Sequence, residues 1–151
     1  MKKFIANRHS GFSMIEVLVA VLVLAIGLLG VAAIQTTALK NNNSALQRSQ
    51  ATMLAYFMMD AMRANPEDAK NLSYNLSKTC VRPTSSSLVT YDQYAWIDAL
   101  KDNLGNVPTT CGEIICVTAS KTCEVKVYWD DSRGLSGSAE QFIVVTSRLW
   151  L

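Results

Sequence analysis

Few residues of this 151-residue chain combine a reactive type with an unusual position. Glu16 stands at the start of a long apolar run, since residues 17–34 contain no charged and no strongly polar side chain. A carboxylate is costly in hydrocarbon unless a cation or hydrogen-bond donors satisfy it. The position of Glu16 therefore predicts a positively charged partner rather than a catalytic role.

The four cysteines, Cys80, Cys111, Cys116 and Cys123, all lie in the C-terminal half of the chain. If the N-terminal segment marks export, an even number of cysteines indicates disulfides. A zinc site is the alternative, but the paired Cys-x2-4-Cys knuckles are missing and the only histidine is His9. We expect disulfides and no metal ligands.

Sequence patterns of catalysis are missing: there is no G-x-S-x-G, no P-loop and no H-E-x-x-H. Asp98 and Asp102 share a helix face, but exposed acids on a helix usually form a solvated surface rather than a catalytic pair. The sequence Asp130-Asp131-Ser132 lacks the pattern of an EF-hand calcium loop. We therefore expect no enzyme, no cofactor and no metal.

The charge of the chain is unevenly placed. The formal net charge is +2, and three of the fourteen basic residues, Lys2, Lys3 and Arg8, precede Gly11. From Gln35 onwards eleven basic residues balance eleven acidic ones. The C-terminal part is thus neutral, which argues against nucleic-acid binding, because that function needs a basic face.

The apolar run is long enough for a membrane, since eighteen helical residues span roughly 27 Å. The basic residues before it place the N-terminus in the cytoplasm by the positive-inside rule. Three interpretations are open: a secretory signal peptide cleaved near "VAA" at 31–33, a plain membrane anchor, or a prepilin leader that ends at Gly11. Glu16 favours the third, because neither of the others gains from an acid there.

The stretch "GFSMIEVLVAVLVLAIGLLG" resembles the N-terminus of type IV pilins and pseudopilins. The shared features are Gly11, then Phe12, then Glu16 as the fifth residue of the mature chain, and they cover about the first quarter of the sequence. The resemblance implies that a membrane-embedded prepilin peptidase cuts between Gly11 and Phe12. It also implies that the enzyme N-methylates Phe12.

Cleavage would create an α-amine on Phe12, four residues before Glu16. Groups four residues apart lie on one face of a helix, so the two charges can neutralise each other near the membrane interface. In a filament the Phe12 amine of one subunit can instead meet the Glu16 carboxylate of its neighbour. Because an unpaired buried charge costs several kcal/mol, this pair would set the axial register of assembly.

Helical spacing continues beyond the apolar run. Leu39, Leu46 and Met53 recur every seven residues, and we expect them to share a buried stripe with Leu54, Phe57, Met58, Ala61 and Met62. The four methionines Met53, Met58, Met59 and Met62 are expected in the core rather than in a binding groove. Pro66 ends the helix near residue 64. One helix is thus predicted, with residues 12–34 as its membrane or filament-core half and 35–64 as its amphipathic half.

Residues 65–151 form the predicted globular domain. Residues 65–89 are predicted to be a connecting loop with a short helical turn, and 90–105 a second helix with a capping box from Thr90 to Gln93. The apolar stripe of that helix contains Trp96, Ile97, Leu100 and Leu104. Strands are predicted at 113–119, 123–129 and 141–151.

The predicted hairpin of strands 113–119 and 123–129 favours one pairing of the four cysteines. Cys116 and Cys123 fall on its facing sides, which favours a Cys116–Cys123 bond and leaves Cys80–Cys111, although three connectivities are possible. The order of long helix, loop, short helix and antiparallel sheet predicts an α+β fold, and it suits the pilin fold.

Further details resemble minor pilins of the PilV type. They are the "MRANP" helix end, the helix that ends in "LKDNLG", and the C-x6-C hairpin followed by "VKVYW". This resemblance implies a minor pilin of a type IV pilus that supports assembly and, through the pilus, adhesion, twitching motility or DNA uptake. A pseudopilin of a type II secretion system is the alternative.

The resemblance also implies partners and a location. The partners would be other pilins, the prepilin peptidase, the inner-membrane assembly machinery and the membrane itself, with no nucleic acid bound directly. The protein would cross the bacterial inner membrane once before assembly. Afterwards it would lie in the pilus, the periplasm or at the cell surface.

Overall fold

The computed structural model describes residues 11–148, and the chain divides into two compact units at Ala38 and Leu39. The basic residues Lys2, Lys3 and Arg8 of the predicted leader lie outside the described residues. So do the last three residues of the predicted final strand, 149–151.

A single helix, α1 (Met14–Ala64), contributes to both units. In the first unit every residue from Gly11 to Thr36 is exposed. This part of α1 contains a window that is long and apolar enough to cross a membrane. The helix ends at Ala64 because the proline at 66 disfavours helical geometry at Asn65. These bounds agree with the predicted helix to within two residues.

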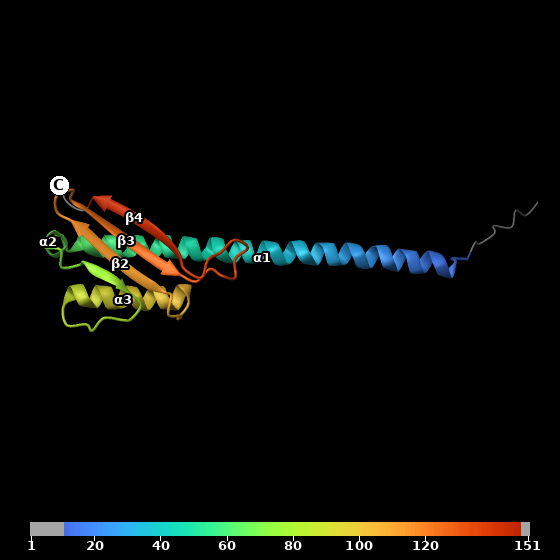
Figure 1. Ribbon diagram of the computed structural model, residues 1–151, viewed down its shortest axis with the longest axis horizontal. Coiled ribbons are helices and arrows are strands. Elements are labelled where there is room, and N and C mark those ends of the chain that lie inside the picture. The colour runs from blue at the N-terminus through green and yellow to red at the C-terminus, as the bar shows by residue number, and fades with distance from the viewer. Residues whose placement is uncertain (1–10, 149–151) are drawn as a thin grey trace, which may run out of the picture. The chain divides into compact units, whose positions relative to one another are not determined.

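The second unit contains a four-stranded antiparallel sheet and two further helices (Figure 1). In chain order the elements after α1 are α2 (Pro66–Lys70), β1 (Leu76–Thr79), α3 (Leu88–Leu104), β2 (Cys111–Val117), β3 (Thr122–Trp129) and β4 (Gln141–Arg148). The strands lie in the order β1-β2-β3-β4. A long helix packed on an antiparallel sheet, with a short helix beside it, is the predicted α+β, pilin-like arrangement.

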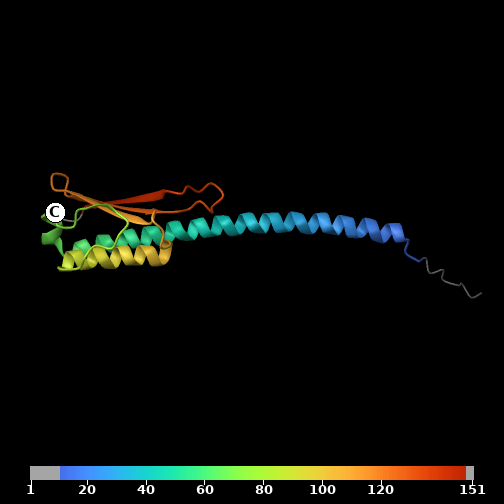
Figure 2. The same ribbon diagram turned by 60° about the horizontal axis from the view of Figure 1, so that its bottom comes forward.

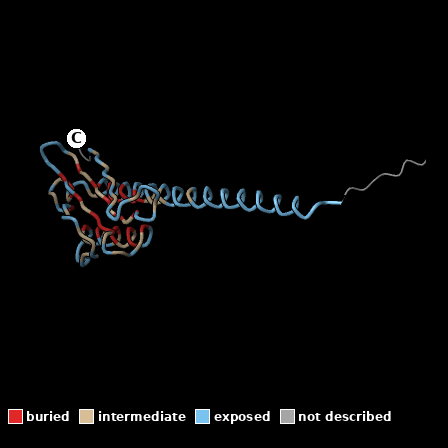
Figure 3. The backbone as a smooth tube through the Cα atoms, turned by 45° about the vertical axis from the view of Figure 1, so that its right-hand side comes forward, coloured by how far each residue is buried: buried red, intermediate tan, exposed pale blue. Residues whose placement is uncertain are grey.

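The two faces of the sheet differ in environment. Residues of β3 alternate between buried odd and half-buried even positions, as expected of a strand with one covered face. The covered face packs on the second half of α1 and on α3, which lie side by side (Figure 2). Buried residues gather between the sheet and these helices (Figure 3).

The core combines aromatic and methionine side chains. Its largest fully buried members are Trp96, Trp129, Tyr74, Met58, Met59, Met62, Ile97 and Leu100. Three of the four methionines singled out in the sequence thus pack inside, as predicted, and so do the four apolar residues of the α3 stripe. Unbranched methionines suit this layer because they adapt to the gaps that large aromatic rings leave.

The predicted stripe of α1 is wrong in part. Leu39, Leu46, Met53 and Phe57 are all more than half exposed, whereas Ala51 and Ala55 are fully buried together with Met58, Met59 and Met62. The two alanines explain this choice of face, because their small side chains let the sheet and α3 approach the helix closely. The heptad-spaced residues then fall on a face that the domain leaves open.

The start of α3 also differs from the prediction. Its N-cap is Ser87, whose Oγ accepts from the backbone N–H of Thr90, while the Thr90 hydroxyl accepts from the N–H of Ser87. Gln93, the predicted capping partner, is buried and donates from Nε2 to the carbonyl oxygen of Tyr74 at 3.1 Å. Leaving a buried amide without a hydrogen-bond partner costs more free energy than leaving an exposed one. The buried hydrogen bond of Gln93 to Tyr74 is therefore favoured over a capping role at the helix start.

Strand β1 lies inside the segment predicted to be a loop. It has only four residues, and its pairing with β2 shifts register between Leu76 and Thr79. So short a segment carries no readable alternation, and its backbone is ordered by pairing with β2. The expected helical turn is α2, with Pro66 in its first turn.

Candidate assembly site

The predicted processing site lies in the open. Gly11, Phe12 and Ser13 precede α1 and all are exposed, with 84% of Phe12 accessible. The helix begins just after them, where the carbonyl of Ser13 accepts from the N–H groups of Glu16 and Val17 at 3.0 and 3.3 Å. Gly11 and Phe12, the two residues of the predicted cleavage point, therefore lie outside any helix or strand.

Glu16 lies in the first turn of α1 and is exposed. A carboxylate at this end of a helix is favoured by the partial positive charge of the unpaired N–H groups. The stabilising free energy of that interaction is much smaller than the free-energy cost of placing an unpaired carboxylate in hydrocarbon. Among the described residues, none forms an ion pair with Glu16.

The expected pairing of the Phe12 amine with Glu16 on one helix face concerns the cleaved chain and stays a prediction. Phe12 lies two residues before α1 begins, so Phe12 and Glu16 do not share a helix. The helix would have to extend by two residues, to Phe12, for an internal pair to form on one helix face. A pair between neighbouring subunits has no such requirement.

The second unit adds a surface that the sequence pattern assigned to the core. Leu39, Leu46, Met53 and Phe57 form an exposed apolar stripe along α1, which we call the open stripe. Residues seven apart lie on nearly the same side of a helix, in the spacing that packs helices against each other. The prediction that these residues are buried is wrong, because the heptad spacing marks a face that the domain leaves uncovered. The sequence pattern alone does not indicate which of the two apolar faces of the helix the domain covers.

Both disulfides occur as predicted pairs. Cys80, directly after β1, bonds to Cys111 at the start of β2, and Cys116 bonds to Cys123 across the β2–β3 hairpin. The first bond closes a segment of 31 residues that contains α3. The second lies in the core, with both cysteines buried.

Three of the acids considered for chemistry, Asp98, Asp130 and Asp131, accept hydrogen bonds from other residues of the domain. Asp98 accepts from Arg82 Nε at 2.5 Å, and Asp131 is buried and accepts from the hydroxyl of Ser44 at 2.5 Å. The Asp130 carboxylate accepts from the side chain and backbone N–H of Ser132, which lowers its pKa. No group of three His, Cys, Asp or Glu residues suited to a metal occurs within residues 11–148.

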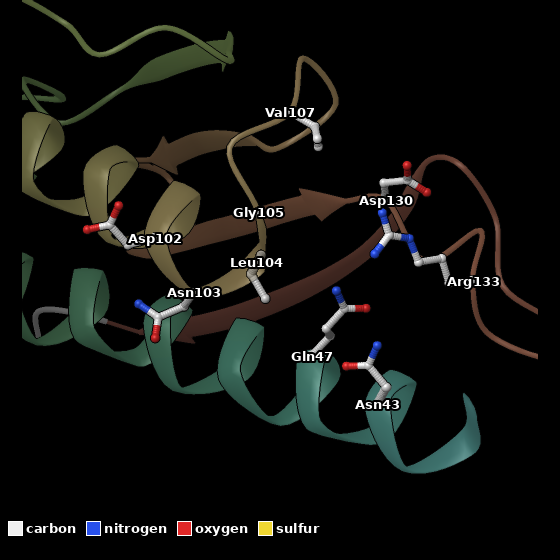
Figure 4. A pocket seen from close by; sticks show the side chains of 9 residues that line it. All are labelled: Asn43, Gln47, Asp102, Asn103, Leu104, Gly105, Val107, Asp130 and Arg133. Carbon is white, nitrogen blue, oxygen red and sulfur yellow. The ribbon is translucent and has the colours of Figure 1, made fainter. Parts of the chain in front are cut away.

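The loop between β3 and β4 rests on α1 through the Ser44–Asp131 bond. It leaves hollows beside it, one of which has a volume of about 330 Å³ and is lined by nine residues (Figure 4). Asn43 and Gln47 enter it from α1 and Arg133 from the loop. This end of the domain was not singled out in the sequence, because its residues come from three distant segments.

Residues 6–32 match the family model of the prokaryotic N-terminal methylation motif. The match contains Gly11, Phe12 and Glu16 together with most of the apolar run. No curated protein and no solved structure matches the chain. The motif supports a type IV pilin-like or pseudopilin protein, and with the apolar helix it fits membrane anchoring.

Proposed function

We propose that this protein is a minor pilin of a type IV pilus, of the PilV type, that supports pilus assembly and pilus-dependent adhesion, twitching motility or DNA uptake. The observation that carries the proposal is the position of Glu16. It is the single ionisable residue between Gly11 and Lys40, on a helix whose first half is exposed throughout.

The physical reason lies in what can satisfy that carboxylate. Cleavage after Gly11 produces a terminal amine on Phe12, and methylation keeps its positive charge. When apolar helices assemble, Glu16 of one subunit becomes buried and needs this amine from a neighbour. A mismatched register leaves both charges unpaired at a cost of several kcal/mol, so the pair selects one axial position.

The open stripe supports the same function. Leu39, Leu46, Met53 and Phe57 give the second unit an exposed apolar stripe of its own. A soluble monomer gains nothing from apolar residues at heptad spacing, whereas neighbouring helices in a filament would cover them. We infer that the partners are other pilins, and that the prepilin peptidase and the inner-membrane assembly machinery act on the protein first.

Location and chemistry follow from this role. Before assembly the protein would cross the inner membrane once, with its N-terminus in the cytoplasm, and then pass into the pilus at the cell surface. We assign no catalysis and no cofactor to it.

The test is N-terminal processing combined with substitution of Glu16. The mature protein should begin at N-methylated Phe12, and Glu16→Ala should be cleaved normally yet be missing from sheared pili. Val17→Ala is the matched control, since it alters the next residue without removing a charge, and it should enter pili. A mature terminus near Ile34 would instead indicate a signal peptide, and normal incorporation of Glu16→Ala would contradict the proposed register role.

A pseudopilin of a type II secretion system shares this N-terminus. Deletion of the gene separates the two functions. Loss of pili with normal secretion of exoproteins supports the minor pilin, and the reverse result supports the pseudopilin.

A further inference from the structure

A basic hollow lies where the β3–β4 loop meets the start of the second unit. It has a volume of about 490 Å³ and is lined by Leu39, Lys40 and Asn43 of α1 and by Ser132, Arg133 and Gly134 of the loop. Two cationic side chains, one hydroxyl and one amide thus face one space. No carboxylate lines it.

The two cations are not used by the fold. Within residues 11–148, neither Lys40 nor Arg133 forms an ion pair. The nearby acids already have protein donors, since Asp131 accepts from Ser44 and Asp130 from Ser132. Arg133 lies close enough to help lower the pKa of Asp130, but within residues 11–148 it forms no ion pair with that carboxylate. Lys40 and Arg133 are therefore free to receive an anion.

The lining suits a phosphate. Two cations can share its negative oxygens, while the amide of Asn43 can donate a further hydrogen bond. Leu39, which is 68% exposed, adds an apolar contact at the rim of the same hollow. An anion that also carries apolar groups would use all of these features.

The position along the chain favours a lipid as the source. Lys40 follows the end of the apolar run at Ile34 by six residues, which span about 9 Å as a helix and about 20 Å at full extension. Either distance is within reach of the headgroup layer of a membrane that the apolar run crosses. Basic pockets next to membrane helices bind anionic headgroups for this reason.

We propose that the hollow around Lys40 and Arg133 binds the phosphate of an anionic phospholipid headgroup while the subunit is held in the membrane. The membrane-anchored subunit would bind an anionic phospholipid in preference to a neutral one. It would release this lipid when it moves from the membrane into a filament. This inference rests on the membrane anchoring in the proposed function and not on the choice between pilus and secretion system.

The experiment uses the full chain in lipid nanodiscs of phosphatidylcholine, with or without phosphatidylglycerol. Acetylation of Lys40 by a water-soluble reagent is measured by mass spectrometry of its peptide. Phosphatidylglycerol should protect Lys40, and native mass spectrometry should find that lipid retained. Lys40→Gln and Arg133→Gln should each weaken retention about fivefold, the effect of one basic residue near an anionic surface.

Two controls separate the site from general charge. Arg48→Gln removes another exposed cation of α1, and Lys121→Gln removes one at the β2–β3 turn. Both should retain the lipid as the unmodified protein does. Equal losses in all four variants would overturn the proposed site.

A further arm distinguishes the source of the phosphate. Inorganic phosphate is added to the protein in a maltoside detergent without lipid. Protection of Lys40 by inorganic phosphate but not by phosphatidylglycerol would overturn the lipid assignment, and protection by neither would overturn the anion site. Failure of the chain to enter nanodiscs of either composition would instead contradict membrane anchoring itself.

Discussion

The indole N–H of Trp96 donates to the backbone carbonyl of Leu54 at 3.0 Å, in the buried layer between α3 and α1. The carbonyl lies inside a helix, where its other lone pair serves the helical hydrogen bond. One hydrogen bond thus fixes the short helix against the long one. The opposite side of the Trp96 ring lies under Gly112 of β2, where a Cβ would come within 2.4 Å of the ring. Trp96 therefore sets the position of α3 against both α1 and the sheet.

A comparison of two buried tryptophans measures how much the Trp96–Leu54 hydrogen bond contributes to the unfolding free energy. Trp96 and Trp129 are both fully buried, but among the described residues Trp129 Nε1 has no hydrogen-bond partner. Substitution by Phe removes similar volume from each. We expect Trp96→Phe to cost about 1 kcal/mol more unfolding free energy than Trp129→Phe, the worth of one net hydrogen bond. Chemical unfolding of the full chain in detergent, followed by near-ultraviolet circular dichroism, measures both. Equal costs would mean that the Trp96–Leu54 bond contributes nothing.

The Cys80–Cys111 disulfide should stabilise the domain chiefly by restricting the unfolded chain. Its 31-residue loop predicts that replacing both cysteines by Ala lowers the unfolding free energy by about 3–4 kcal/mol. The 7-residue loop of Cys116–Cys123 predicts about 2 kcal/mol from closure alone. Denaturant titrations of the two double variants measure these losses. Mass spectrometry without reduction should find no free thiol, and two free cysteines would contradict the pairing.

The open stripe should matter for assembly and not for folding. Leu46→Asp places a charge on an exposed face, so we expect the unfolding free energy to change by less than about 0.5 kcal/mol. The same change should reduce incorporation into pili strongly, because a neighbouring helix would bury the charge. Ser49→Asp adds the same charge at an exposed polar position of α1 and serves as the control. Pili containing the two variants in equal amounts would show that the open stripe is not an interface.

The stability of the domain should fall at high pH because of two tyrosines. Burial, together with a hydrogen bond to Asp92, raises the pKa of Tyr74 from 10.0 to about 12. Burial and a hydrogen bond to Glu113 likewise raise the pKa of Tyr128 to about 12. Between these values the unfolded chain loses phenolic protons that the folded chain keeps, so unfolding becomes more favourable as the pH rises.

Ultraviolet titration of the phenols and denaturation at about pH 9 and about pH 11 test this expectation. The stabilising effect is complete below pH 10 and is lost as the pH approaches 12. Tyr128→Phe should reduce the pH dependence, whereas Tyr91→Phe, at an exposed tyrosine of α3, should leave it unchanged. Ionisation of all five tyrosines near pH 10 would contradict the buried environments.

The sequence by itself determined the features that depend on local order. The apolar run, the placement of Glu16 after Gly11 and Phe12, and the proline after α1 are each readable within a few residues. The hairpin and its disulfide are also local, because Cys116 and Cys123 are brought together by a short turn. Period-2 alternation in β3 and the apolar spacing of α3 required no knowledge of distant contacts.

Only the tertiary structure decided which side of α1 is covered. Residues 39–62 of α1 present two apolar faces, and the sequence predicts that the face of Leu39, Leu46 and Met53 is buried in the core. The sheet and α3 instead take the side of Ala51 and Ala55, since small residues permit close approach and Trp96 can reach the Leu54 carbonyl. Other long-range contacts order β1 by pairing with β2, give the buried Gln93 its partner in Tyr74, and place Lys40 and Arg133 around one hollow. Each of these depends on the free energy of packing distant segments together, which no pattern along a single segment contains.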